Sequence, residues 1–192
     1  MPDDTLLCGK RGSPSAVAVK DYKAWDRHPD RGWSKKPAFI RQRLRERFIE
    51  PISSIPIDAR HGFTTMAINC LLIETLEAFQ RGWTSTKTRS AESFRYFFSR
   101  QPRFAEFNGA GISYDFYENV RCGLLHQGET RNGWTIVRAG PILQSKRINA
   151  TKFHGRLAGA INDYHEELAN PANRSLRANF ENKMKFIIEQ AR

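Results

Sequence analysis

The sequence has few cysteines and no long apolar run. Its 192 residues include three cysteines, Cys8, Cys70 and Cys122, which are scattered, odd in number and not paired at the spacing of metal ligands. This pattern argues against a disulfide framework and a zinc site and fits a reducing cytoplasm. No apolar stretch reaches about 18 residues, so we expect no membrane span. The acidic start of the chain lacks the apolar segment of a secretory signal.

Acidic residues are outnumbered by basic ones. The chain carries 31 lysines and arginines against 20 aspartates and glutamates, which gives a formal net charge of +11. The excess lies in residues 1–50 and 131–192, whereas residues 51–130 are balanced. A surplus of this sign suits binding to a polyanion, and an ordinary solvated surface explains it equally well.

The pattern along the chain predicts one domain with an extension. Residues 1–37 lack sustained periodicity and are rich in glycine, proline, serine and charge, so we predict a flexible basic N-terminal arm. Residues 38–192 are predicted to form a single domain that is mainly α-helical. A small β-hairpin insert is expected at about 134–148, because two β-prone stretches flank Ala139-Gly140-Pro141.

The strongest helix signal extends from Gly62 to Phe79, which is apolar over most of its circumference and therefore predicts a central, buried helix. Glu74 lies on the same side of this helix as Phe63 and Cys70. An unpaired buried carboxylate costs several kcal/mol, so we expect an arginine beside it. An ordinary core ion pair, with Arg121 among the candidate partners, satisfies this expectation without any catalytic role.

A second helix is predicted at residues 39–49 and is expected to end at the prolines 51 and 56. Its apolar face carries Ile40, Leu44 and Phe48. The other faces carry a row of four arginines, Arg41, Arg43, Arg45 and Arg47. These arginines are candidate contacts for the phosphate backbone of RNA, and a solvated helix face is an equally good interpretation.

Arg121 and His126 stand near the end of a helix predicted at about 113–126, with Gly128 just beyond it. An arginine keeps its charge and a histidine titrates near neutrality, so the pair suits holding a phosphodiester and moving its proton. Five positions on an α-helix amount to about 500°, so the two side chains diverge by about 140° within one chain. From spacing alone, ordinary roles are more common: an ion pair of Arg121 with Glu118, and a surface histidine at a helix C-terminus.

The segment Tyr-Glu-Asn-Val-Arg-Cys-Gly-Leu-Leu-His-Gln-Gly-Glu-Thr at 117–130 follows a long buried helix with an inward carboxylate. It resembles the bacterial, mobile-element and defence-associated branch of the HEPN superfamily, whose signature is Arg-x4–6-His. The matching residues are Arg121 and His126. The resemblance covers about residues 38–190 in pattern, and only the motif segment is specific. One departure is Cys122, where many members have an asparagine directly after the arginine.

The resemblance implies a HEPN-like helical bundle that forms a homodimer, in which each chain contributes one Arg121 and one His126 to a shared cleft. It implies a cytoplasmic, metal-independent endoribonuclease without a cofactor, acting as a toxin or defence effector and controlled by an antitoxin or defence-system partner. His126 would serve as acid or base, Arg121 would bind phosphate oxygens, and Glu74 would support them. Tyr114 and Tyr117 are candidates for stacking on RNA bases, although core packing is the commoner fate of such residues.

Two other functions stay open. One is a non-catalytic helical dimer that binds nucleotides, RNA or a protein partner through the same pair of residues. The other is a nucleic-acid-binding protein that uses its basic flanks alone. The remaining histidines considered, His61, His154 and His165, lack a matching partner at a diagnostic spacing and are interpreted as surface or packing residues.

Overall fold

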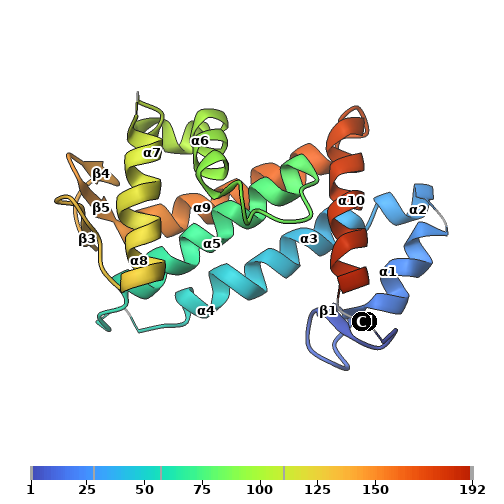
Figure 1. The fold of residues 1–192 in the computed structure, drawn as a ribbon. Helices are drawn as coiled ribbons and strands as arrows, with labels where there is room; N and C mark the ends of the chain where they lie inside the picture. Colours follow the sequence, from blue (N-terminus) through green and yellow to red (C-terminus); the bar gives the residue numbers. More distant parts are fainter. Residues whose placement is uncertain (1, 28, 57, 110, 191–192) are drawn as a thin grey trace. The chain divides into compact units, whose positions relative to one another are not determined.

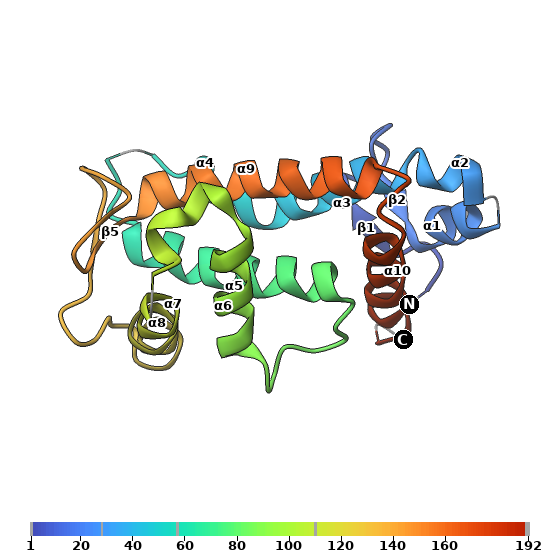
Figure 2. The same ribbon diagram turned by 90° about the horizontal axis from the view of Figure 1, so that it is seen from above.

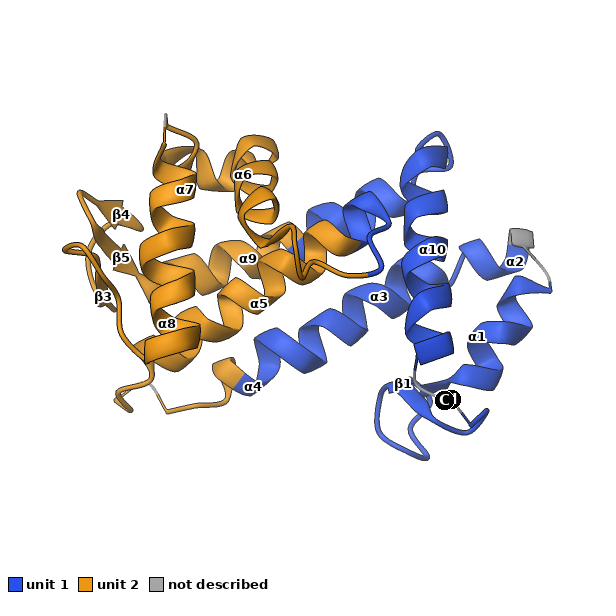
Figure 3. Cartoon of the chain, viewed as in Figure 1, with its two compact units in different colours: residues 1–51, 79–84, 161–192 blue, residues 52–78, 85–160 orange. Residues whose placement is uncertain are grey.

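The computed structural model describes residues 2–27, 29–56, 58–109 and 111–190. The fold is mainly helical with two small sheets, which confirms the predicted fold class at this level (Figures 1 and 2). The chain divides into two compact units (Figure 3). The first comprises residues 1–51, 79–84 and 161–192, and the second comprises residues 52–78 and 85–160.

Most elements belong to one unit. The first unit contains β1 (Leu6–Cys8), β2 (Val17–Ala18), α1 (Val19–Asp26), α2 (Pro29–Trp33), α3 (Lys36–Leu44), a π-helical turn (Arg45–Ile49) and α10 (Arg174–Gln190). The second contains α6 (Ser90–Arg100), a 3-10 helix (Pro102–Phe107), α7 (Ile112–Phe116), a π-helical turn (Tyr117–Arg121), α8 (Cys122–Gln127), β3 (Thr135–Val137), β4 (Leu143–Gln144) and β5 (Arg147–Asn149). Three helices contribute residues to both units: α4 (Glu50–Ser53), α5 (Gly62–Arg81) and α9 (Ala150–Ala169).

The segment predicted as a flexible arm contains two strands and two helices, β1 to α2. A buried lysine anchors it. Lys36, with a side chain only 3% exposed, donates to Asp26 over 2.6 Å and to Glu181 on α10. Its ammonium lies 5.2 Å from the ring of Tyr22 and 5.0 Å from that of Trp33, and Tyr22 donates to Glu181 over 2.9 Å. Carboxylates and rings together compensate the desolvation of the lysine, and the segment is thereby attached to α10.

The helix that begins at α3 continues through Pro51 and ends at Ser53, two residues beyond the expected stop. The π-helical turn lies directly before this end, and the N–H of Glu50 donates to the carbonyl of Arg45. In such a turn the hydrogen bond reaches the fifth residue back, and Pro51, which has no amide hydrogen, directly follows the donor Glu50. A single π-turn changes the spacing of apolar residues too little to be predicted from the sequence.

The predicted hairpin is a three-stranded sheet with the order β3-β5-β4. The hairpin itself is made of β4 and β5, which are antiparallel with Leu143 opposite Ile148 and are joined at Ser145, a residue at φ +55°. β3 pairs with β5 in parallel, with Thr135 opposite Arg147. The prediction paired the two stretches directly and was wrong in topology, because a two-residue turn within the second stretch carries no glycine or asparagine signal.

An aromatic cluster forms the core of the second unit. Seven phenylalanines that are at most 1% exposed come from α6, the 3-10 helix, α7 and α9: Phe94, Phe97, Phe98, Phe104, Phe107, Phe116 and Phe153. The rings of Phe116 and Phe153 stack at 5.7 Å with an interplanar angle of 7°, and those of Phe98 and Phe107 stack at 4.9 Å. Phe116 belongs to α7, so this cluster holds the helix that carries the motif.

Replacing Lys36 by methionine tests whether the N-terminal segment is attached as described. Methionine keeps much of the volume but leaves the carboxylates of Asp26 and Glu181 without their cation, so we expect the free energy of unfolding to fall by about 2–4 kcal/mol. Urea unfolding measures the loss. Lys20→Met removes an exposed ion pair with Asp4 and is expected to move the midpoint little. If Lys36→Met and Lys20→Met lowered the free energy of unfolding equally, Lys36 would not attach the N-terminal segment as described.

Candidate functional site

One continuous helix carries Arg121 and His126. It consists of α7, the π-turn and α8, as the sequence predicts, and begins after Gly111 at φ +79°. Its buried stripe contains Phe116, Val120 and Leu124. It ends at Gly128, a left-handed residue at φ +71° whose N–H donates to the carbonyl of Leu124 over 3.1 Å. Glycine adopts this conformation without steric cost, which explains the position of the helix end.

A π-turn interrupts this helix just before the arginine. The N–H of Cys122 donates to the carbonyl of Tyr117, five residues back, and the wide turn ends at Arg121. Such a turn inserts one extra residue and rotates the side chains on either side of it relative to each other. Turns of this kind occur frequently at functional sites. The hydrophobic spacing of the sequence did not predict it.

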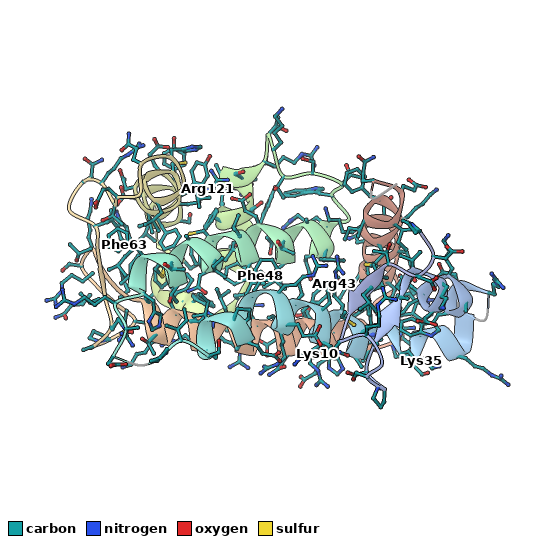
Figure 4. All side chains as sticks on the ribbon, turned by 90° about the horizontal axis from the view of Figure 1, so that it is seen from below. Lys10, Lys35, Arg43, Phe48, Phe63 and Arg121 are labelled. Carbon is teal, nitrogen blue, oxygen red and sulfur yellow. The ribbon has the colours of Figure 1, made fainter. Side chains whose placement is uncertain are left out.

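Arg121, labelled in Figure 4, forms an ion pair with Glu74 that joins the motif helix to α5. The Nε of Arg121 donates to Oε1 of Glu74 over 2.7 Å, and the two side chains are 15% and 10% exposed. The second carboxylate oxygen, Oε2, accepts from the hydroxyls of Thr86 and Ser90, each at 3.2 Å. The inward carboxylate therefore has the arginine partner that the sequence predicts, and two further donors complete its hydrogen bonding.

Burial and pairing shift the pKa of Arg121 in opposite directions. Burial lowers it, whereas the hydrogen bond and the charge of Glu74 raise it by more, so the pKa lies above its ordinary value. Burial also raises the pKa of the Cys70 thiol. Burial and a contact with Cys122 raise the pKa of Tyr117 to about 12, so its phenol keeps its proton at neutral pH. Within this cluster Arg121 supplies a permanent positive charge, and neither Cys70 nor Tyr117 is suited to act as a base.

His126 is exposed on the last turn of α8. From Cys122 to Gln127 the backbone is regular α-helix, so the expected divergence of about 140° between Arg121 and His126 applies. Arg121 is bound at Nε by Glu74, whereas the side chain of His126 makes no hydrogen bond or ion pair with the described residues. One chain alone therefore does not bring the two side chains onto a common ligand.

The chain beyond the motif returns to pack against the helix at Gly123. A Cβ at this position would lie 2.3 Å from the carbonyl oxygen of Glu129, and the N–H of Glu129 donates to Gly123 over 3.4 Å. The obstacle is backbone, which cannot move aside as a flexible side chain can. Glycine is thus required three residues before His126, and the turn that carries this histidine depends on it.

Buried polar groups hold the same return segment. Asn119 is 3% exposed, donates to Asp115 over 2.6 Å and accepts from Asn132 over 2.8 Å. The indole N–H of Trp134 donates to the other oxygen of Asp115 over 2.9 Å. We did not single out these residues from the sequence, because their partners follow the motif in a loop whose path no periodicity predicts. These contacts fix the segment between α8 and β3.

The two tyrosines predicted to stack on bases differ in exposure. Tyr114 is 61% exposed, whereas Tyr117 is half-buried and lies under the guanidinium of Arg121, 5.8 Å from ring centroid to Cζ. The rings of the two tyrosines are 6.2 Å apart. Tyr114 has the free surface that stacking on a base requires, and Tyr117 supports the arginine.

The predicted row of arginines contains one buried member. Arg43 is 6% exposed and its Nη1 donates to the carbonyl of Leu7, so it ties β1 to α3. Burial, with a smaller contribution from the charge of Arg47, lowers the pKa of Arg43 to about 10. Arg41 and Arg47 are exposed and Arg45 is half-buried. Arg43 is therefore removed from the set predicted to contact RNA, because its guanidinium is enclosed by protein.

Known protein families, curated proteins and solved structures yield no match to this chain. Among the described residues, no three histidine, cysteine, aspartate or glutamate side chains are grouped so that they could hold a metal ion. None of the helices in the described ranges combines the length and apolar character that crossing a membrane requires. Any functional conclusion therefore depends on the geometry of the residues themselves.

Alanine at Gly123 tests the close approach of the return segment. The clash with the Glu129 carbonyl is expected to lower the free energy of unfolding by about 1–3 kcal/mol, as overpacking does. Gly155, within α9, has open space where a Cβ would stand, so Gly155→Ala is expected to stabilise by up to about 1 kcal/mol through helix propensity. Chemical denaturation of both variants measures the difference. A stabilising effect at Gly123 would contradict the packing described.

Proposed function

We propose that this protein is a metal-independent endoribonuclease of the HEPN type, a toxin or defence effector that cleaves RNA at a site shared by two copies of the chain. One observation carries the proposal. Glu74 accepts a hydrogen bond from the Nε of Arg121 and so fixes the position of the guanidinium, and His126 is exposed five residues later on the same helix. A positioned guanidinium fork is suited to phosphate oxygens, and an exposed imidazole is suited to proton transfer.

A second copy supplies what one chain lacks. The divergence of Arg121 and His126 ceases to matter if two motif helices meet about a two-fold axis, because each residue then meets its symmetry mate. Exposed apolar side chains support this arrangement. Phe63 and Leu71 on α5 are 42% and 40% exposed, and Tyr114 on α7 is 61% exposed. They lie on the two helices that hold the ion pair, and exposed apolar surface of this kind is typical of an interface.

The chemistry requires three actions. The 2′-oxygen attacks the adjacent phosphorus while the bond to the 5′-oxygen breaks, so the attacking hydroxyl must lose a proton and the leaving oxygen must gain one. In the proposed pair, one neutral His126 accepts the first proton and its protonated copy donates the second. Arg121 binds the non-bridging oxygens and interacts more strongly as negative charge develops on them. Glu74 positions Arg121 and does not touch the substrate.

The non-catalytic alternative has an observation in its favour. Arg121 is only 15% exposed at its side chain and is already paired, which suits a structural role. Under this alternative the protein would be a helical dimer that binds nucleotides, RNA or a protein partner without cleaving. The two functions predict different results for a variant that keeps an ion pair with Glu74 but lacks the planar guanidinium. Only the nuclease would lose RNA cleavage in such a variant.

Arg121→Lys makes that distinction, because lysine can still pair with Glu74 but lacks the planar fork. We expect purified protein to cleave RNA in the presence of a chelator and to leave DNA intact, since DNA lacks the attacking hydroxyl. Arg121→Lys and His126→Ala are each expected to slow cleavage by about 10²–10⁴-fold with unchanged unfolding midpoints. Gln127→Ala, next to the histidine, serves as the matched control.

Measured rates of RNA cleavage in these four proteins decide the question. Full activity in either Arg121→Lys or His126→Ala would eliminate the mechanism, as would a requirement for added metal. Absence of cleavage by the wild-type protein, together with retained RNA binding, would favour the non-catalytic dimer.

A further inference from the structure

A pocket opens at the start of the motif helix, within the second unit. It has a volume of about 470 Å³ and draws its lining from the start of α7, the return segment and the turn between β4 and β5: Gly111, Ile112, Asp115, Trp134, Ser145 and Lys146. Asp115 precedes Arg121 by six residues, which amounts to about 9 Å along an α-helix. The pocket is therefore close to the ion pair of Arg121 and does not include it.

An ion pair between Asp115 and Lys146 belongs to the lining. The Nζ of Lys146 lies 3.3 Å from Oδ2 of Asp115, and the two side chains are 44% and 37% exposed. The lining holds this carboxylate and this ammonium and no other charged side chain. Its charges compensate each other, so a neutral polar ligand suits the pocket better than an ion.

Both members of the pair keep hydrogen-bonding capacity. Oδ2 of Asp115 also accepts from the indole N–H of Trp134 over 2.9 Å, whereas Oδ1 accepts from the side chain of Asn119 over 2.6 Å. The Nζ of Lys146 donates to the carbonyl of Asn132 over 3.1 Å in addition to its contact with Asp115. A carboxylate oxygen can accept two hydrogen bonds and an ammonium can donate three. One acceptor position at Oδ1 and one N–H of the lysine thus stay available.

The rest of the lining is apolar or small. Ile112 is half-buried, and Trp134 is 3% exposed and fixed by its hydrogen bond to Asp115. Ser145 adds one hydroxyl. At Gly111 the space that a Cβ would occupy is open to a distance of 4 Å. Apolar walls with a few placed polar groups, in a volume between about 300 and 1,000 Å³, are typical of sites for small organic groups.

Two aromatic rings lie between this end of the helix and Arg121. Tyr114, next to Asp115 in the sequence, is 61% exposed, and its ring lies 6.2 Å from that of Tyr117. The ring of Tyr117 lies 5.8 Å from Cζ of Arg121. Aromatic side chains of this kind offer a stacking surface to any base of a single strand. The motif helix thus carries surface suited to RNA from the pocket to the guanidinium.

We propose that this pocket receives one base of the RNA strand that is bound at Arg121, and that it sets a base preference close to the cut. The inference rests on the nuclease function proposed above. The edge of a nucleobase presents donors and acceptors side by side, which match the acceptor left at Asp115 and the N–H left at Lys146, while its apolar faces match Ile112 and Trp134. Sequence-specific recognition of single-stranded RNA uses unstacked bases in this manner.

RNA strands that resist cleavage test the pocket independently of catalysis. The probes are 2′-O-methyl strands of about eight nucleotides, a typical site size, in which adenine, cytosine, guanine or uracil alternates with abasic positions. In nuclear magnetic resonance titrations we expect saturable shifts of the indole N–H of Trp134 and of the amides of Ser145 and Lys146. One strand is expected to bind about tenfold more tightly than the weakest, as for a base-specific pair of hydrogen bonds. Binding without shifts at these residues, or no binding, would overturn the proposal.

Two variants locate the base preference, and Asp115 is left unchanged because it also holds Trp134. Lys146→Ala removes the donor and Ile112→Trp fills the pocket, and each is expected to reduce the preference to about twofold or less, since the contacts to the base edge are lost. Lys152→Ala removes the same charge from an exposed position on α9 outside the lining and is expected to keep the preference. An unchanged preference in both pocket variants would show that the pocket does not read the base.

Cleavage of unmodified RNA separates this inference from the function on which it rests. We expect the wild-type protein to cut beside a preferred base and Lys146→Ala to cut without that preference. If the wild type cleaves and both proteins share one preference, the pocket proposal is wrong and the nuclease proposal stands. If the strands bind at the pocket with a base preference and the wild type does not cleave, the nuclease proposal is wrong and base recognition stands.

Discussion

The ion pair between Arg121 and Glu74 is the constraint on which the proposed site depends. A carboxylate with a side chain 10% exposed on a central helix is stable only with a cation and further donors, and Arg121, Thr86 and Ser90 provide them. The pairing fixes the position of the arginine relative to α5 and raises its pKa despite burial. Nε is the atom that donates to Glu74. The contact that compensates the buried carboxylate therefore also positions a group suited to binding phosphate.

The surrounding packing keeps this pair in place. Phe116 enters the aromatic cluster of the second unit, the π-turn ends at Arg121, and Gly123 admits the returning backbone at Glu129. Each of these contacts acts on the motif helix from a different element, so the direction of Arg121 and the position of His126 are set by tertiary packing. Within one chain the side chains of Arg121 and His126 point in directions about 140° apart. Only a second chain can then bring an arginine and a histidine to the same phosphate. A dimer is thus a requirement of the proposed chemistry and not an addition to it.

Local patterns were sufficient for much of the helical structure. The long apolar stretch from Gly62, the helix end at Gly128 and the inward Glu74 with an arginine partner all follow from periodicity, glycine conformation and the cost of a buried charge. Features with distant partners were not predicted. Lys36 pairs with Glu181, β3 joins β5 in parallel, and Asp115 shares a pocket with Trp134 and Lys146. Spacing along the chain carries no information about such contacts.

The proposed chemistry requires His126 from both chains, one copy as base and the other as acid. A mixed dimer of wild-type and His126→Ala chains tests this requirement most directly. The two chains carry different affinity tags, are co-expressed, and the mixed dimer is isolated through both tags. Because it holds a single His126, which cannot accept one proton and donate the other at the same time, we predict that it cleaves RNA about as slowly as the His126→Ala dimer. Cleavage at about half the wild-type rate, in a mixed dimer shown to have formed, would contradict a site shared by two chains.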